Sequence, residues 1–302
     1  MSPEHDPEKC AAVFGKDHAP PKKLAAGALT TIHRRALQRA HDQLENQKFA
    51  ARLAEYAGQP LERMLRMMPK PASQGLNKAI EIAILRCLNL AVRSIDQRAK
   101  GPPRRKLASL AAGVSGAVSG FFGAAALPVE LPVTTALMLR AIADTARHYG
   151  EDLSRFEARL ACVEVFALGS GGTAGNGSAR RIDVGYFATR ALLAKLAGEA
   201  SAFLIERTAV TASTPVVNSL LSEIVARFGV IASERLAATA VPVLGAAGGA
   251  AINVIFMNHF QRVAQGHFII RRLERLYGPA LIRREYEELS LRAQRPRTAL
   301  AG

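Results

Sequence analysis

The sequence predicts an all-α protein: a multi-helix bundle with two central apolar helices rich in Gly and Ala, which leaves membrane association open. Three observations carry this prediction. No segment shows a sustained two-residue alternation of polarity, whereas apolar residues recur at three- and four-residue steps along most of the chain. Two long stretches, Leu107–Val129 and Leu236–Gln261, contain no charged residue. With 302 residues, 49% of them hydrophobic, the chain is long enough to bury a substantial core.

The N-terminal part is expected to hold three helices before the first apolar stretch. Apolar residues from Ile32 to Leu44 recur at helical spacing, with Thr30 or Thr31 as the N-cap and Gly58-Gln59-Pro60 as the stop. Two further helices are expected over residues 61–68 and 74–98. The Gly101-Pro102-Pro103 segment ends the last of them.

Beyond the first apolar stretch, a helix break is expected at Pro128–Pro132. Helices are then predicted over 132–149, 153–168, 183–206 and 215–228, with a glycine-rich loop over 169–178. The second apolar stretch follows, and a basic amphipathic helix pair spans residues 260–291, broken at Gly278-Pro279. One domain is expected over residues 29–292, with a flexible lead-in over 1–28 and a flexible tail over 293–302.

Small residues form a stripe on each apolar stretch. On a helix, residues three and four apart share one face, and a face of glycines lets another backbone approach closely. We therefore expect the two stripes to pack against each other. The residues concerned are Gly113, Gly116, Gly120, Gly123, Gly245 and Gly249.

Either apolar stretch is long enough to invite a membrane interpretation. Against it, Leu107–Leu127 consists mainly of Ala, Gly and Ser, which gain little on transfer to lipid, and the second stretch contains Pro242, Asn253 and Asn258. Central helices of a bundle, shallow insertion and true spanning all stay open at this point.

The chain is strongly basic, with 40 Lys and Arg against 25 Asp and Glu and a formal charge of +15. Such a charge favours anionic partners. The basic clusters flank the apolar stretches, which fits an anionic membrane surface better than nucleic acid, because neither a recognition motif nor many stacking aromatics accompany them. The candidate residues are Arg104, Arg105, Lys106, Arg271, Arg272, Arg275, Arg283 and Arg284.

No group of residues amounts to a defined catalytic site. The weak candidates are Glu130, between two prolines, and Asp144 with His148, four residues apart on one helix. Helix capping is the favoured explanation for Glu130, and surface ion pairing for Asp144 and His148. The three isolated cysteines and the absence of a metal-binding motif predict no metal, no cofactor and no disulfide framework, and favour a cytoplasmic protein.

Two long segments resemble the EcsC family of bacterial proteins. They are Gly123–Asp144 with His148-Tyr-Gly-Glu-Asp152, and Val241-Pro-Val-Leu-Gly245 through Asn253 to Arg272–Gly278. The similarity covers roughly residues 75–290. The family takes its name from a gene beside an ABC exporter and has no established activity, so the resemblance implies no catalytic residues.

We therefore expect a cytoplasmic helical protein at the periphery of the inner membrane, attached to its anionic surface or to a membrane complex such as an ABC transporter. Two alternatives stay open. One is a soluble enzyme with a site near Glu130, Asp144 and His148, and the other is nucleic-acid binding through the arginine clusters.

Overall fold

The computed structural model describes residues 28–45, 52–55, 109–113, 127–169, 185–206, 215–239 and 245–294. These residues form helices and turns without a strand, which confirms the predicted all-α class. The named helices are α2 (Thr31–Glu45), α7 (Leu127–His148), α8 (Phe156–Leu168), α9 (Tyr186–Glu206), α10 (Pro215–Thr239), α11 (Gly245–Tyr277) and α12 (Pro279–Gln294).

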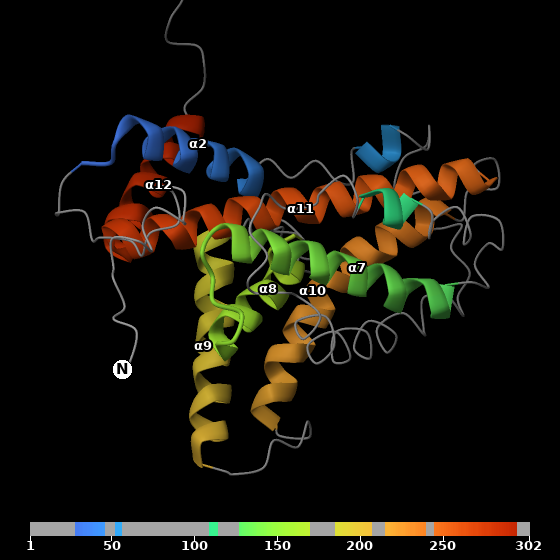
Figure 1. Ribbon diagram of the computed structural model, residues 1–302, viewed down its shortest axis with the longest axis horizontal. Coiled ribbons are helices and arrows are strands. Elements are labelled where there is room, and N and C mark those ends of the chain that lie inside the picture. The colour runs from blue at the N-terminus through green and yellow to red at the C-terminus, as the bar shows by residue number, and fades with distance from the viewer. Residues whose placement is uncertain are drawn as a thin grey trace, which may run out of the picture.

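Helix α11 is the axis of the molecule (Figure 1). Its 33 residues span about 50 Å at the usual helical rise. Helices α2, α7, α8, α10 and α12 all pack against it. Where α8 and α10 meet α11, four aromatic rings pack together in the core, with neighbouring centroids 4.8–6.0 Å apart: Phe166, Phe228, Phe256 and Phe260.

Helix α2 lies across α11 as its amphipathic pattern predicts. Thr30 is the N-cap, since its Oγ1 accepts a hydrogen bond from the backbone N–H of His33 at 3.3 Å. The apolar positions Leu37, Ala40 and Leu44 are buried. They approach α11 at Gly266, where a Cβ atom would lie 2.9 Å from Leu44 Cγ and 3.1 Å from the backbone oxygen of Ala40.

The segment 109–113 belongs to the first apolar stretch, and it lies against the N-terminal half of α11. Asn253 Nδ2 donates to the backbone oxygen of Ala112 at 3.1 Å, while Asn253 Oδ1 accepts from buried Arg235 of α10 at 2.7 Å. A Cβ on Gly113 would lie 3.3 Å from Val254 Cγ2. Asn253 is a polar residue within the second apolar stretch, and its position is explained by these buried hydrogen bonds, which link three segments of the chain.

The predicted packing of two glycine stripes is not settled by these contacts. Gly113 meets α11 beyond the second stripe, at Val254. Gly116, Gly120 and Gly123 lie outside the described residues, as do the helices expected over 61–68 and 74–98 and most of the two terminal segments. Contact between the stripes stays a prediction.

Several helix boundaries differ from the sequence-based expectation. Helix α7 does not begin at Pro132 but at Leu127 and runs through that proline. Pro128 falls in the first turn, where a backbone N–H has no helical partner, so only Pro132 removes a bond. Helix α10 continues past the expected end at residue 228 to Thr239, and α11 is a single helix through residue 261. The limits of the uncharged stretch at residues 236 and 261 therefore do not coincide with the ends of helices.

The helix ends expected at residue 149 and at the Gly278-Pro279 break are confirmed to within one residue, since α7 ends at His148 and α11 at Tyr277. Gly150 and Gly278 have φ angles of +83° and +88°, in the region that favours glycine. No helix among the described residues combines the length and the apolar character needed to cross a membrane. Residues 114–126 of the first apolar stretch are outside that description.

The contact at Gly266 yields a stability prediction. Gly266→Ala is expected to destabilise the fold by about 1–2 kcal/mol, because the new methyl group overlaps α2 and this cost exceeds the gain in helix propensity. Urea denaturation followed by circular dichroism measures the effect. The matched control is Gly113→Ala, whose Cβ meets one side-chain methyl group and should change stability little. Equal stability of Gly266→Ala and the parent would contradict the tight α2–α11 contact.

Candidate functional site

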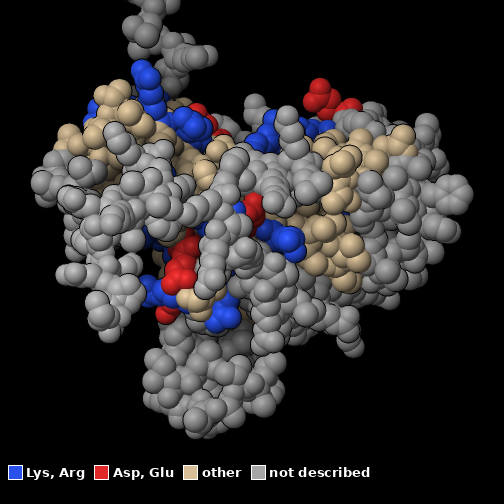
Figure 2. Space-filling view, in the orientation of Figure 1, with Lys and Arg blue, Asp and Glu red and all other residues tan. Residues whose placement is uncertain are grey.

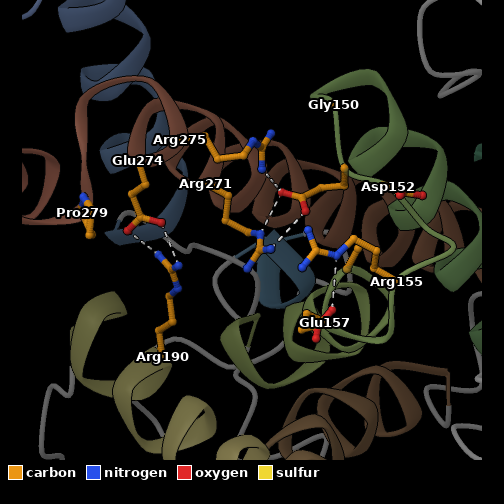
Figure 3. Close-up of a pocket in the computed structure, with 11 residues that line it drawn as sticks. Gly150, Asp152, Arg155, Glu157, Arg190, Arg271, Glu274, Arg275 and Pro279 are labelled. Carbon is orange, nitrogen blue, oxygen red and sulfur yellow. Dashed lines mark hydrogen bonds and ion pairs between the residues drawn. The ribbon is translucent and has the colours of Figure 1, made fainter. Parts of the chain in front are cut away.

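A charged pocket of about 460 Å³ lies at the C-terminal end of α11. Its walls come from the turn between α7 and α8, the first turn of α8, the start of α9 and the junction of α11 with α12 (Figure 3). Four arginines and four carboxylates line it: Arg155, Arg190, Arg271, Arg275, Glu151, Asp152, Glu157 and Glu274.

The α7–α8 turn positions the innermost carboxylate. With Gly150 at positive φ, its N–H bonds to the backbone oxygen of Arg147 at 3.0 Å, and the N–H of Glu151 returns to the backbone oxygen of Ala146, also at 3.0 Å. This left-handed helix end reverses the chain at once and places Glu151 against α11.

Glu151 is held by two arginines one helical turn apart. Arg271 donates from Nε and Nη2 to the two carboxylate oxygens at 2.8 and 3.0 Å, and Arg275 donates from Nη1 to the same carboxylate. Arg275 Nη2 also donates to the backbone oxygen of Tyr149 at 2.6 Å. Burial would raise the pKa of Glu151, but the hydrogen bonds and charges of the two arginines outweigh it and hold that pKa below its ordinary value.

A second ion pair forms the opposite wall. Arg190 of α9 donates from Nη1 and Nη2 to Glu274 of α11 at 2.7 and 2.8 Å, a bidentate pair. Behind it, the Tyr186 hydroxyl lies 3.5 Å from Arg190 Nη1 and 2.9 Å from Nδ1 of fully buried His267. Desolvation keeps the pKa of His267 well below its ordinary value, with the charges of Arg190 and Arg271 acting in the same direction. His267 is therefore neutral, and polar contacts continue from the pocket into the core.

Glu164 adds a buried carboxyl near the same arginines. It lies on α8 and is 7% exposed. Desolvation raises the pKa of Glu164, although the nearby charges of Arg271 and Arg190 lower it in part. Burial therefore makes the charged form of Glu164 less favourable than that of an exposed glutamate.

Arg155 stands at the mouth of the pocket and is the least engaged of the four arginines. Its side chain is 69% exposed, and its ionic contact is Glu157 at 3.6 Å, without a hydrogen bond between them. Exposed pairs of this kind contribute little to stability. Arg155 is also the N-cap of α8, but its side chain makes no capping hydrogen bond.

Two of the sequence-based catalytic candidates, Asp144 and His148, are not part of this pocket. Asp144 accepts a hydrogen bond from Arg147 at 2.7 Å, and the ring of His148 packs edge-on against Tyr149. Glu130 falls within α7, but its side chain lies outside the described residues. The described residues contain no group of three or more potential metal ligands.

The basic residues predicted to bind an anionic surface divide between two environments. Arg271 and Arg275 hold Glu151 at the pocket, whereas Arg283 and Arg284 are exposed on α12. Arg283 pairs with Glu287 at 2.8 Å. Arg272, at the end of α11, is half-buried, and Arg104, Arg105 and Lys106 lie outside the described residues.

A second charged surface lies on the outward side of α2 and α12, which we call the α2–α12 face. It comprises the exposed residues Ile32, Arg34, Arg35 and Arg39 of α2, and Arg283, Arg284, Glu287, Glu288, Leu291 and Arg292 of α12. On α12 two of the cations are paired, Arg283 with Glu287 and Arg292 with Glu288, so the excess positive charge of this face comes mainly from α2. Ile32 is 78% exposed and Leu291 62%. Figure 2 shows Lys and Arg side chains gathered over α2 at the upper left.

Sequence reasoning missed the roles of Glu151, Glu274, Arg155 and Arg190. A weak signal existed for Glu151, since it follows a glycine that ends a helix. The spacing of Arg271 and Arg275 likewise places both on one side of a helix. Neither pattern identifies which carboxylate the arginines meet.

Comparison with known proteins then identifies the family. The model of the EcsC protein family matches residues 32–273, most of the chain. The protein therefore belongs to the EcsC family, as the sequence resemblance indicated, although the match begins at residue 32, well before the residue 75 at which the resemblance was expected to start. No curated protein and no solved structure matches the chain.

The burial of Glu151 yields a second prediction. Glu151→Gln should destabilise the protein by about 2–4 kcal/mol, because it leaves Arg271 and Arg275 without their carboxylate. Since its pKa is lowered on folding, the stabilisation from Glu151 is complete above its ordinary value of 4.5 and is lost as the pH falls through the native pKa. The difference between parent and variant should therefore shrink in acid.

Denaturant titrations at several pH values measure this difference. The control is Asp152→Asn, which changes the neighbouring exposed carboxylate and keeps an oxygen for the hydrogen bonds from Ser154. A pH-independent difference for Glu151→Gln would show that the lost contact is not ionic.

Proposed function

We propose that this EcsC-family protein attaches peripherally to the anionic inner face of the membrane through the α2–α12 face. The observation that carries the proposal is the charge arrangement on α2. Arg35 and Arg39 lie on its exposed side, beside the protruding Ile32, and Arg34 is exposed as well but has an ionic contact with Glu285 of α12 at 3.9 Å. Basic residues near an anionic bilayer each contribute roughly 1 kcal/mol to binding.

The acidic residues of α2 leave this arrangement largely intact. Asp42 and Glu45 lie towards the opposite end of the helix from Arg34 and Arg35. Glu45 Oε1 accepts hydrogen bonds from the Tyr286 hydroxyl at 2.7 Å and from the backbone N–H of Tyr186 at 3.3 Å. The Glu45 carboxylate thus forms hydrogen bonds that link α2 to α12 and α9.

The packing favours electrostatic attachment over insertion. Leu37 and Leu44 of α2 and Ile282 of α12 are buried within the bundle, so neither helix offers a continuous apolar face to lipid. Ile32 and Leu291 remain as single exposed apolar side chains. Binding of this kind weakens as salt screens the charges.

Vesicle sedimentation tests the proposal. The protein should pellet with vesicles of equal parts phosphatidylglycerol and phosphatidylcholine at low salt, and remain in the supernatant in ~0.5 M NaCl or with phosphatidylcholine alone. The double variant Arg35→Gln/Arg39→Gln should bind the anionic vesicles about thirty-fold more weakly, the loss of two contributions of roughly 1 kcal/mol.

The control variant removes the same charge elsewhere. Arg140→Gln/Lys195→Gln changes exposed cations on α7 and α9 and should bind almost as the parent does. Equal loss in both double variants would mean that net charge, not the α2–α12 face, governs binding. Retention of a DNA duplex in place of vesicles would favour the nucleic-acid alternative instead.

A further inference from the structure

The charged pocket has more hydrogen-bond donors than acceptors. A guanidinium carries five N–H groups. The carboxylate oxygens of Glu151 and Glu274 are already occupied by Arg271, Arg275 and Arg190. Among the described residues, Nε of Arg190, Nη1 of Arg271 and the whole guanidinium of Arg155 have no hydrogen-bond acceptor.

The charge of the inner pocket also favours an anion. Arg190, Arg271 and Arg275 face two carboxylates, those of Glu151 and Glu274, so these five side chains together carry one excess positive charge. The buried carboxyl of Glu164 lies close enough to interact with Arg190 and Arg271, but burial raises its pKa. The remaining carboxylates, Asp152 and Glu157, are exposed at the outer edge, where solvent screens them. Arg155 balances one of them and can turn inward, since its contact with Glu157 is long and solvated.

The first turn of α8 adds backbone donors. Glu157 and Ala158 line the pocket, and their backbone N–H groups have no acceptor among the described residues. N–H groups at the start of a helix, together with the helix dipole, favour an anion. By itself this feature would not define a site, but here it borders a cavity already rich in guanidinium groups.

The arrangement of the arginines favours one kind of anion. Arg155, Arg190 and Arg271 come from three different segments of the chain and all line the charged pocket, with Arg271 between the other two in Figure 3. A carboxylate has two oxygens in one plane, which a single guanidinium fork satisfies, whereas a phosphate offers oxygens in several directions. We propose that this pocket binds a phosphate group, with Arg155, Arg190 and Arg271 as its donors.

The volume of about 460 Å³ leaves room for more than the phosphate itself. The group therefore belongs to a small phosphorylated molecule or to a phospholipid headgroup. This site is separate from the α2–α12 face, and neither proposal depends on the other.

Calorimetric titration of the full chain with inorganic phosphate at constant ionic strength tests the proposal, with acetate as the comparator. The parent should bind phosphate at one site and more tightly than acetate. Arg155→Gln should weaken phosphate binding by about ten-fold or more, whereas Arg140→Gln, an exposed arginine outside the pocket, should not. Because Arg155 is exposed, its substitution should leave the fold intact, and circular dichroism checks this.

A second arm distinguishes the sources of phosphate. Vesicles of equal parts phosphatidylglycerol and phosphatidylcholine are titrated with the same two variants. A selective loss of vesicle binding in Arg155→Gln assigns the site to a lipid headgroup, and a selective loss of phosphate binding alone assigns it to a free phosphorylated molecule. The proposal is overturned if Arg155→Gln and Arg140→Gln match in both arms, or if acetate binds as tightly as phosphate.

Discussion

The burial of one carboxylate, Glu151, between Arg271 and Arg275 is the constraint on which the charged end of the molecule depends. The side chain of Glu151 is 6% exposed, so its charge is tolerable only because two guanidinium groups replace the lost water. The pair ties the α7–α8 turn to the end of α11 and thereby fixes the positions of the first turn of α8 and of Arg155. Gly150 makes the arrangement possible, since the turn needs positive φ immediately before the carboxylate.

The long helix α11 connects this buried ion pair to the rest of the fold. Helix α2 packs against α11 at Gly266, and Phe256 and Phe260 contribute to the aromatic cluster. Arg271 and Arg275 form the ion pairs with Glu151. Three of the buried polar residues of α11 meet a partner from another segment: Asn253 Nδ2 donates to the backbone oxygen of Ala112, His259 Nε2 lies 2.7 Å from the backbone oxygen of Gly169, and His267 Nδ1 lies 2.9 Å from the Tyr186 hydroxyl. Such contacts fix the rotation and register of helices that apolar packing alone would leave adjustable.

The helical class, the amphipathic face of α2 with its Thr30 cap, and the glycine ends of α7 and α11 could all be predicted, because each rests on local spacing or backbone geometry. The continuity of α7 through Pro132 and of α10 past residue 228 could not, since tertiary packing overrides such local signals. The pocket was out of reach for another reason. Arg190, Glu151 and Glu274 are distant in sequence, and only the fold brings them together.

If the protein binds the membrane through the α2–α12 face, as we propose, α9 and α10 do not contact the bilayer. Hydrogen–deuterium exchange of the whole chain, with and without phosphatidylglycerol vesicles, measures this most directly because it reports on every helix in one experiment. The account predicts slower exchange on lipid in peptides covering residues 31–45 and 279–294, and unchanged exchange in those covering 186–206 and 215–239. Protection of α9 or α10 with none in α2 would contradict it.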